Sequence, residues 1–369
     1  MKWLQNGNLT KLVAFFVIAV VIICTVSFAA NGWQSFINND TDNNVLADNS
    51  DSNEKEDDKG DGPEDIPVIQ PEPKYYHAIT GLETTLETSL KKPLCITMES
   101  AVPLYGISSS YLTIEFPTEY GNTRLLCFTD EAETLGKIGS LAPSRGYISN
   151  IATCFGGVLL SYGSDDKFEY DFTASNNRLD FKETSGYCYS EYNSYVYTNG
   201  DLVTAFLNNS GISRASADKN PLPYLFSELS EAIVIDGERA SSISISFADN
   251  SSTNLSYSIS DEKYIFTKEG NLKNDLLNDK SLKYDNVFIL YADSTTHETE
   301  TDIQLILDTS TKGSGLYANG GKYIEITWER DASGSLLFYN AEGEILTVNR
   351  GTSYIAFAKS STKASVKIS

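Results

Sequence analysis

The sequence predicts an α+β protein, with a mixed α/β N-terminal domain that holds a strand-helix-strand crossover and a mostly antiparallel β C-terminal domain. Two observations carry this prediction. Between residues 138 and 164, apolar residues at helical spacing lie next to a short apolar run. From Ala232 onward the helical spacing disappears, and short strand-like runs are separated by turn residues. At 369 residues the chain is long enough for two domains with appendages.

The first element is an uncharged segment of nineteen residues, Leu12–Ala30. At about 1.5 Å per residue, a helix of this length spans a bilayer core of roughly 30 Å. Lys2 and Lys11 precede the segment and an acidic stretch follows it. The positive-inside rule then places residues 1–11 in the cytoplasm and the rest outside. We expect a single-pass transmembrane signal-anchor in the cell membrane, with a C-terminal ectodomain.

Two other interpretations of this segment stay open. A cleaved signal peptide would use the small residues at Ser27 and Ala29, but the apolar run is longer than the usual h-region of roughly 7–15 residues. A lipid anchor would acylate Cys24, but the bulky Ile23 precedes it where a small residue is expected. The sequence favours the uncleaved anchor, then the cleaved signal, then the lipid anchor.

Residues 31–74 predict a disordered tether. Between residues 38 and 72 there are twelve Asp or Glu and two Lys, followed by a proline-rich end. Such a segment buries too little apolar surface to offset the entropy of ordering it, and charge and proline extend it. Asp40 and Asp42 begin a calcium-loop spacing, but Val45 stands where that loop requires glycine. We therefore expect no metal there.

Residues 75–230 are the predicted N-terminal domain. Ser144 is the predicted N-cap of a helix, and Arg145 takes its first position. Apolar residues at helical spacing follow, and Gly156-Gly157 ends the helix. Residues 201–208 predict a second short helix. The strand-like runs are Lys92–Met98, Tyr111–Phe116, Arg124–Phe128, Val158–Ser161 and the tyrosine-rich Tyr187–Tyr197.

Residues 231–360 predict the β domain, and residues 361–369 a tail. Ile324, Ile326 and Trp328 alternate with polar residues, which indicates one buried and one wet face. Gly320-Gly321 after Asn319 indicates a hairpin. The predicted strands are Ile243–Phe247, Leu255–Ile259, Tyr264–Thr267, Val287–Tyr291, Ile303–Leu307, Lys322–Trp328, Leu336–Tyr339, Ile345–Val348 and Tyr354–Phe357.

Composition argues against several functions. A formal net charge of −22 opposes binding to nucleic acid or to an anionic lipid surface. The five cysteines include no metal-ligand spacing, and no cofactor motif is found. The two histidines, His77 and His297, lie in no catalytic pattern. We expect the four cysteines beyond the anchor to be buried free thiols, with one disulfide as an alternative in an oxidising compartment: Cys95, Cys127, Cys154 and Cys188.

Several blocks, in order and spacing, resemble the YerB-like family of extracytoplasmic lipoproteins from Gram-positive bacteria, a conserved domain of unknown function with N- and C-terminal parts. Where that family has a Gly-Pro-Val-Arg run this chain has Gly139–Ala142, and where it has a histidine this chain has Tyr162. The resemblance implies an envelope location but no activity. The blocks that resemble the family are Thr80-Gly81-Leu82, Lys92–Met98, Tyr111–Phe116, Glu119–Phe128, Ile138–Arg145, Gly156–Ser164 and Gly313–Trp328, with the hairpin FYNAEGEI after the last of them.

Arg145 is the starting point for a candidate site, because a cation at a helix N-terminus opposes the helix dipole unless an anion lies in front of it. That anion is a carboxylate of the chain, Glu115 or Glu119, or a bound phosphate. The structural ion pair is the favoured interpretation. If the predicted strands are parallel, their carboxyl ends form a cleft. The predicted ligand or anion cleft comprises Arg145, Arg124, Glu115, Glu119, Ser161 and Tyr162.

The sequence favours a membrane-anchored, non-enzymatic binding or interaction module of the cell envelope, with an envelope protein or a wall polymer as partner. The alternative is a hydrolase or transferase acting on envelope glycopolymer, with Glu115 and Glu119 as paired carboxylates. Pro117 between them disturbs the strand register that would place them on one face.

Overall fold

The computed structural model describes residues 73–163, 178–182, 184, 186–191, 194–215, 222–228, 232–298 and 303–369. The predicted anchor at 12–30 with Cys24, and the tether up to residue 72, lie outside these residues. Within the described ranges, every helix is too short or too polar to cross a bilayer.

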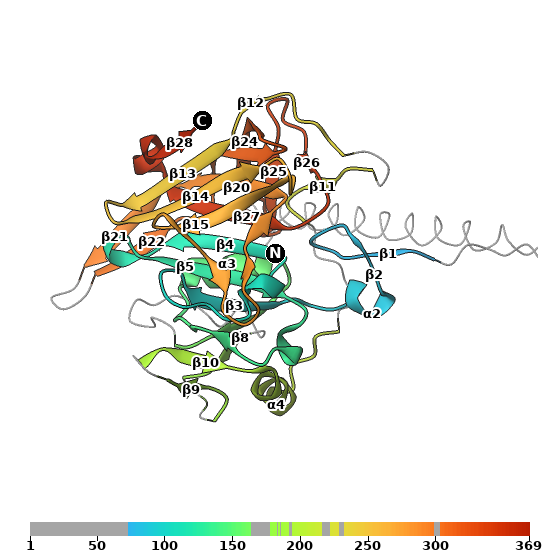
Figure 1. Ribbon diagram of the computed structural model, residues 1–369, viewed down its shortest axis with the longest axis vertical. Coiled ribbons are helices and arrows are strands. Elements are labelled where there is room, and N and C mark those ends of the chain that lie inside the picture. Colours follow the sequence, from blue (N-terminus) through green and yellow to red (C-terminus); the bar gives the residue numbers. More distant parts are fainter. Residues whose placement is uncertain are drawn as a thin grey trace, which may run out of the picture. The chain divides into compact units, whose positions relative to one another are not determined.

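The described chain is built mainly of strands, as predicted, around one large mixed sheet (Figure 1). Its central strands are mostly apolar in sequence, because strands buried on both faces need no alternation of apolar and polar residues. In spatial order the sheet contains β12 (Glu238–Arg239), β24 (Lys322–Arg330), β23 (Lys312–Asn319), β20 (Asn286–Ala292), β27 (Ser353–Lys359), β4 (Leu112–Pro117), β5 (Thr123–Thr129), β3 (Leu94–Glu99), β7 (Val158–Ser161) and β8 (Arg178–Asp180), and β25 (Leu336–Tyr339) pairs with β24.

Both halves of the chain contribute to this sheet. β4 from the first half pairs in parallel with β27 from the second, with Ile114 beside Ile355. The boundary predicted near residue 230 therefore lies within one compact unit that extends from Pro71 to Ser369. Long-range parallel pairing of this kind leaves no signal in local periodicity.

The strand-helix-strand crossover differs from the prediction. The predicted helix is α3 (Gly146–Cys154), and it leads into β7. β7 pairs in parallel with β3, but β5 lies between β4 and β3 and is antiparallel to both. The strand directly before α3, β6 (Ile138–Gly139), belongs to another sheet. The α3 connection therefore does not join two neighbouring parallel strands.

A second, antiparallel sheet covers one face of the large one and contains most of the remaining strands of the second half. The predicted hairpin is confirmed, with Asn319 paired to Lys322. The last residues are not a tail, because β28 (Val366–Ile368) pairs with β13. In order this sheet contains β16 (Asn271–Leu272), β15 (Lys263–Lys268), β14 (Ser251–Ser258), β13 (Ser242–Ala248) and β28, and β19 (Lys283–Tyr284) pairs with β15.

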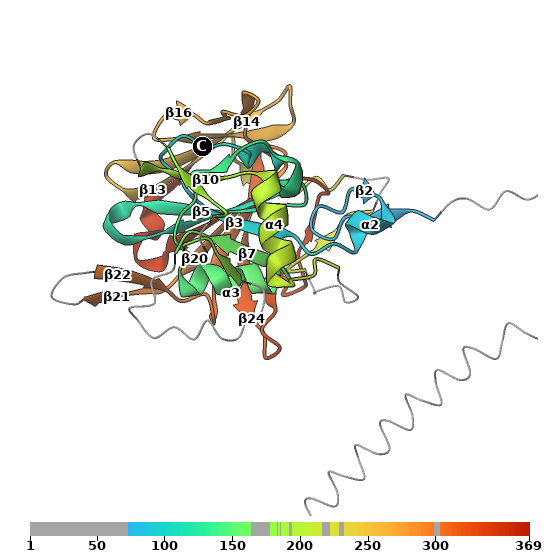
Figure 2. The ribbon, with the colours of Figure 1, turned by 90° about the horizontal axis from the view of Figure 1, so that it is seen from below.

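The two longer helices pack on opposite faces of the large sheet (Figure 2). α4 (Gly200–Ser210) shares a hydrophobic cluster with the second sheet, and α3 belongs to the other cluster. α3 begins one residue later than predicted, with Arg145 as its N-cap. It ends at a close approach that only glycine permits, since a Cβ at Gly157 would lie 2.0 Å from Cys95 Sγ.

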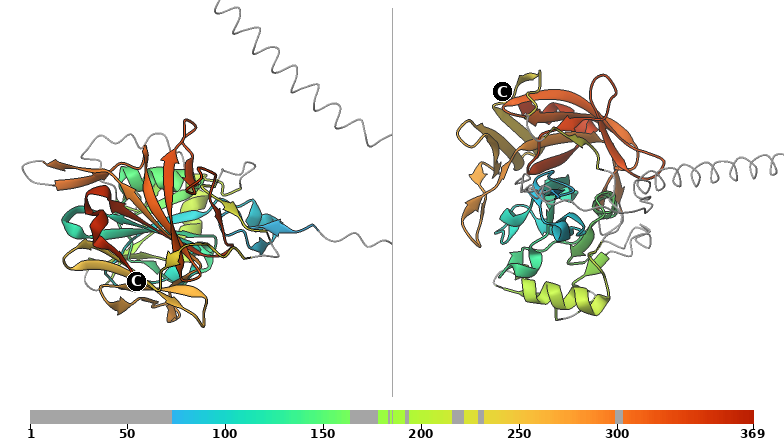
Figure 3. Two further views of the ribbon diagram at one scale, coloured as in Figure 1. Left: turned by 90° about the horizontal axis from the view of Figure 1, so that it is seen from above. Right: turned by 90° about the vertical axis from the view of Figure 1, so that its right-hand side faces the viewer.

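The remaining elements are short. The β21 (Ser294–Glu298) and β22 (Ile303–Leu307) hairpin, coloured orange, extends away from the body (Figure 3). The others are β1 (Tyr75–Tyr76), β2 (Glu83–Thr84), α2 (Leu86–Ser89), η1 (Ile107–Ser109), η2 (Glu119–Gly121), η3 (Ala132–Thr134), β9 (Tyr189–Ser190), β10 (Val196–Thr198), β11 (Leu225–Phe226), β17 (Asn274–Asp275), β18 (Lys280–Ser281), β26 (Thr347–Val348) and η6 (Ser360–Ser365).

Candidate functional site

Glu115 lies in a closed polar network between the two sheets. It is completely buried on β4, and Lys268 at the end of β15, also completely buried, donates to its Oε1 at 2.7 Å. Thr123 donates to the same oxygen at 2.5 Å. Thr253 and Tyr354 donate to Oε2 at 2.7 and 2.5 Å. Both carboxylate oxygens are thus fully used by the chain itself.

This network also decides the ionisation of Glu115. Burial alone would raise its pKa, but the charge and hydrogen bond of Lys268 and the hydroxyls of Thr123 and Tyr354 together hold the pKa below its ordinary value. The lowered pKa and the ion pair with Lys268 favour the ionised form of Glu115 near neutral pH.

Arg145 forms the ion pair that the sequence favoured, and Glu119 is its partner. Arg145 Nη2 lies 2.8 Å from Glu119 Oε2, and Arg145 Nε donates to Oε1 at 3.3 Å. The backbone N–H of Leu305 donates to the same Oε1 at 3.0 Å, which ties η2 to the β21–β22 hairpin. Burial acts to raise the pKa of Glu119, but Arg145 and the backbone donors outweigh it and the pKa is lowered.

Arg124 lies close to this pair on the α3 side of the sheet. Its side chain is 11% exposed, and Glu99 Oε1 lies 3.9 Å from its Nε. Burial and the positive charge of Arg145 lower the pKa of Arg124 below its ordinary value. Nε and Nη1 of Arg124 are buried and have no hydrogen-bond partner among the residues that the structure describes. The guanidinium is therefore much less well satisfied than that of Arg145.

Two hydroxyl groups on the same face are likewise buried and unsatisfied. Thr97 on β3 and Ser161 on β7 are completely buried, and neither hydroxyl oxygen has a hydrogen-bond partner in the described part of the chain. The parallel register that pairs Ile96 with Leu160 brings Thr97 and Ser161 side by side. Their neighbours at alternate positions, Cys95 and Leu159, belong to the cluster that contains α3. Both hydroxyls therefore point to the α3 side.

Four of the six predicted site residues thus lie on or beside the α3 face: Arg145, Arg124, Glu119 and Ser161. Glu115 does not join them, since it points to the opposite face toward the second sheet. Tyr162 is half-buried and packs against the cluster on that opposite side. The alternation along strands explains both outcomes, because each is an odd number of positions from a residue on the α3 face.

Sequence reasoning missed Thr97 and Glu99, which end β3 on the α3 face. The period of two along the strand Leu94–Glu99 could have predicted them, since every second side chain from Cys95 points to the same face of the sheet. Lys268 was also missed. It follows a predicted strand that gives no sign of its burial, and its partner lies 153 positions away.

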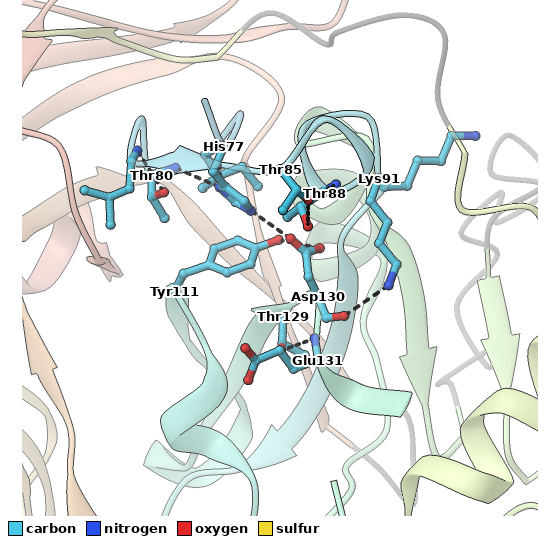
Figure 4. Close-up of polar contacts among 12 residues, drawn as sticks. His77, Thr80, Thr85, Thr88, Lys91, Tyr111, Thr129, Asp130 and Glu131 are labelled. Atoms are coloured by element: carbon cyan, nitrogen blue, oxygen red, sulfur yellow. Dashed lines mark hydrogen bonds and ion pairs between the residues drawn. The ribbon is translucent and has the colours of Figure 1, made fainter. Parts of the chain in front are cut away.

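A second polar cluster lies where the N-terminal segment meets the body (Figure 4). His77 Nε2 lies 2.9 Å from Asp130 Oδ2. The N–H groups of Ile79 and Thr80 donate to His77 Nδ1 at 3.2 and 3.1 Å. Nδ1 is thus an acceptor, so Nε2 carries the proton and donates it to Asp130. Both ring nitrogens are engaged, which leaves neither for a substrate.

Arg214 fastens the same cluster from the segment after α4. Its Nη2 lies 3.2 Å from Asp130 Oδ1, its Nη1 pairs with Glu133, and its Nε donates to the carbonyl of Lys92 at 2.9 Å. The cluster holds three separate chain segments together, and its hydrogen bonds and ion pairs therefore have a structural role.

A pocket of about 500 Å³ opens between residues 227, 228 and 232–235 and the turns of the second half. Three of its charged groups already have partners in the protein: Lys263 Nζ lies 2.8 Å from Asp285 Oδ2, and Arg350 donates to the carbonyls of Ser227 and Gly81. None of the six predicted site residues lines it.

Metal and thiol chemistry find little support in the described ranges. No group of three or more His, Cys, Asp or Glu side chains there could hold a metal ion. The four cysteines in these ranges are free. Burial raises the pKa of Cys154 to about 11 despite the nearby charge of Arg330, so this thiol stays protonated near neutral pH.

Comparison with known proteins gives a fold and a family, without an activity. Residues 79–216 match the N-terminal domain, and residues 243–355 the C-terminal domain, of the protein family of unknown function DUF3048. The crystal structure of the YerB protein from Bacillus subtilis is similar with a TM-score of 0.69 and 19% sequence identity, over 80% of this chain and 100% of that chain. No curated protein matches the sequence.

Proposed function

The chain belongs to the YerB-like DUF3048 family, and from this starting point we propose that it is a non-enzymatic binding module at the outer face of the cell membrane. It binds another component of the envelope, a protein or a wall glycopolymer, through the α3 side of the large sheet. The predicted anchor at 12–30 holds it at the membrane, and the acidic tether sets it off from the surface.

The observation that carries this proposal is the state of the two carboxylates on which the enzyme alternative depends. A glycosidase needs two carboxyl groups that face one open site. Here Glu115 is completely buried against Lys268, and Glu119 is held by Arg145 and Leu305. Neither can act as acid, base or nucleophile without breaking an ion pair, so the hydrolase or transferase alternative loses its catalytic groups.

Photocrosslinking in intact cells tests the binding role. Tyr120 is 74% exposed and directly follows Glu119, so a photoreactive amino acid at this position reports on the proposed surface. Ile259 is 86% exposed at the turn between β14 and β15 and serves as the matched control. We expect a discrete adduct from position 120 and none from position 259. Equal adducts from both positions, or none from either, would contradict the proposal.

Protease protection tests the proposed location separately. The full-length protein should lose its ectodomain when protease is added to intact spheroplasts, while residues 1–11 stay protected. Complete protection of the protein would place the ectodomain in the cytoplasm and overturn the topology, whatever the crosslinking experiment shows.

A further inference from the structure

We infer that the α3 face holds a site for a single tetrahedral oxyanion, of the phosphate class, formed by the guanidinium of Arg124, the hydroxyls of Thr97 and Ser161 and the N-terminus of α3. This inference rests on the proposed binding role and names the chemistry that the ligand would bring. It moves the predicted anion site from Arg145, which Glu119 already neutralises, to Arg124.

The side chains are the first argument. A buried polar group without a hydrogen bond costs about 1–3 kcal/mol, so chains rarely keep several of them in one place. Here Nε and Nη1 of Arg124 and the hydroxyls of Thr97 and Ser161 all lack a partner in the described ranges. They come from three neighbouring strands, β5, β3 and β7, and lie on one face. Donors that converge from three strands fit an oxyanion with several oxygens better than a planar carboxylate.

The helix supplies the second argument. The first N–H groups of a helix have no carbonyl within it to bond, and they favour an anion. The N-cap of α3, Arg145, makes no side-chain cap. α4 differs, because Asn199 caps it through a bond from the N–H of Leu202 at 2.9 Å. The uncapped helix is thus the one whose N-cap, Arg145, acts electrostatically on Arg124, and the N–H of Ser144 before it donates to the carbonyl of Gly163, two residues after Ser161.

The charge of the chain limits the size of the ligand. A net charge of −22 repels a polyanion that would lie along the surface. A single phosphate group inserted between strand ends avoids most of that repulsion. The sources are free phosphate or the phosphate group of an organic ester, and the two share the donors described above.

Glu99 makes the site sensitive to pH. It lies 3.9 Å from Arg124 and competes with a bound anion for the same guanidinium. Burial raises the pKa of Glu99 above its ordinary value, although Arg124 and Arg145 act to lower it. Glu119 also faces this region, but its pairing with Arg145 keeps it ionised. Acidification therefore neutralises Glu99 first and leaves Arg124 free for the ligand.

Calorimetric titration of the full-length protein with inorganic phosphate, glycerol phosphate and sulfate, at constant ionic strength, tests the inference. We expect saturable binding, and loss of at least tenfold in affinity in Arg124→Gln. Arg239→Gln, an exposed arginine on β12, is the matched control and should bind as the wild type does. Tighter binding of glycerol phosphate than of phosphate would identify an ester as the ligand, and the reverse would identify the free ion.

Two further variants keep the test decisive if Arg124→Gln folds poorly. Thr97→Val with Ser161→Ala removes both hydroxyls and should also weaken binding at least tenfold. Glu99→Gln should strengthen sulfate binding at pH 7 and remove its pH dependence, since sulfate keeps its charge across this range. Equal binding by wild type, Arg124→Gln and the hydroxyl variant would overturn the site. The titration contains no envelope component. That result would therefore remove the anion site and leave the binding role to be decided by the crosslinking experiment.

Discussion

Two buried charged clusters lie on opposite faces of the same strands, and they differ in how completely the protein satisfies them. On the face toward the second sheet, Glu115 and Lys268 are both completely buried and bonded to each other, and three hydroxyl groups, those of Thr123, Thr253 and Tyr354, donate to Glu115. On the α3 face, two nitrogens of Arg124 have no hydrogen-bond partner in the described ranges, and Glu99 lies 3.9 Å away. A chain that satisfies the polar groups of one cluster with its own hydrogen bonds can do the same in the other. The cluster with unsatisfied donors is therefore where we expect a ligand to bind.

The largest loss of unfolding free energy should come from removing the cation that is buried beside Glu115. Lys268→Met leaves Glu115 as a buried anion without a cation, which should cost about 3–5 kcal/mol of unfolding free energy in denaturant titration. Lys263→Met is the matched control on the same strand. Its side chain is 35% exposed in the pair with Asp285, so its loss should cost less than about 1 kcal/mol.

The double variant Glu115→Gln/Lys268→Met separates the two contributions in that experiment. It should be more stable than Lys268→Met alone, because the buried charge is gone. A loss in Lys268→Met no larger than that in Lys263→Met would show that the buried pair does not hold the sheets together.

The next comparison is between the two arginines. Arg145→Ala should cost about 2 kcal/mol, because it removes charged hydrogen bonds to a nearly buried Glu119. Arg124→Gln should change the unfolding free energy by less than about 1 kcal/mol, since it removes groups that the protein does not satisfy. Thermal and denaturant unfolding of both variants measure this. The reverse order would make Arg124 the structural arginine and Arg145 the better candidate for ligand binding.

Acid should affect the stability contributed by these buried carboxyl groups with opposite sign, because folding lowers the pKa of Glu115 and Glu119 and raises that of Glu99. The pKa values of Glu115 and Glu119 are lowered by folding, so their stabilisation is present above the unfolded pKa of about 4.3 and is lost as pH falls below it. The pKa of Glu99 is raised, so its contribution is present below about pH 4.3 and is lost as pH rises through the folded value.

Denaturant titration from pH 3 to pH 8 distinguishes the two signs. Glu115→Gln/Lys268→Met should lose less stability on acidification than the wild type does. Glu99→Gln should gain stability relative to the wild type at pH 7 and little at pH 3. Parallel pH profiles of all three proteins would show that these carboxyl groups do not set the acid response.

Local sequence patterns predicted the elements better than their partners. β4, β5 and α3 follow from apolar runs, although the N-cap of α3 is Arg145 and not the predicted Ser144, and the hairpin at Asn319 follows from its turn. The pairing of β4 with β27 could not be predicted, because parallel strands from the two ends of the chain have no local signal. For the same reason Lys268 was unforeseen, whereas the ion pair of Arg145 followed from its place at a helix start.

The sharpest contrast should come from the same substitution made in the two clusters. Thr253→Val removes a donor from Glu115 Oε2 in the closed cluster and should cost about 1–3 kcal/mol, since it leaves a buried carboxylate oxygen short of a partner. Thr97→Val replaces a completely buried hydroxyl that has no partner in the described chain. It should be neutral or stabilising by up to about 1 kcal/mol when no anion is added.

Added phosphate should narrow the difference in stability between those two variants. It should stabilise the wild type and Thr253→Val to the same extent, by RT ln(1 + [L]/Kd), and should stabilise Thr97→Val less. Salt effects on the whole surface are shared by all three proteins and cancel in this comparison. If Thr97→Val is destabilised without phosphate and responds to phosphate as the wild type does, the hydroxyl has a structural partner and the α3 face is as closed as the face that holds Glu115.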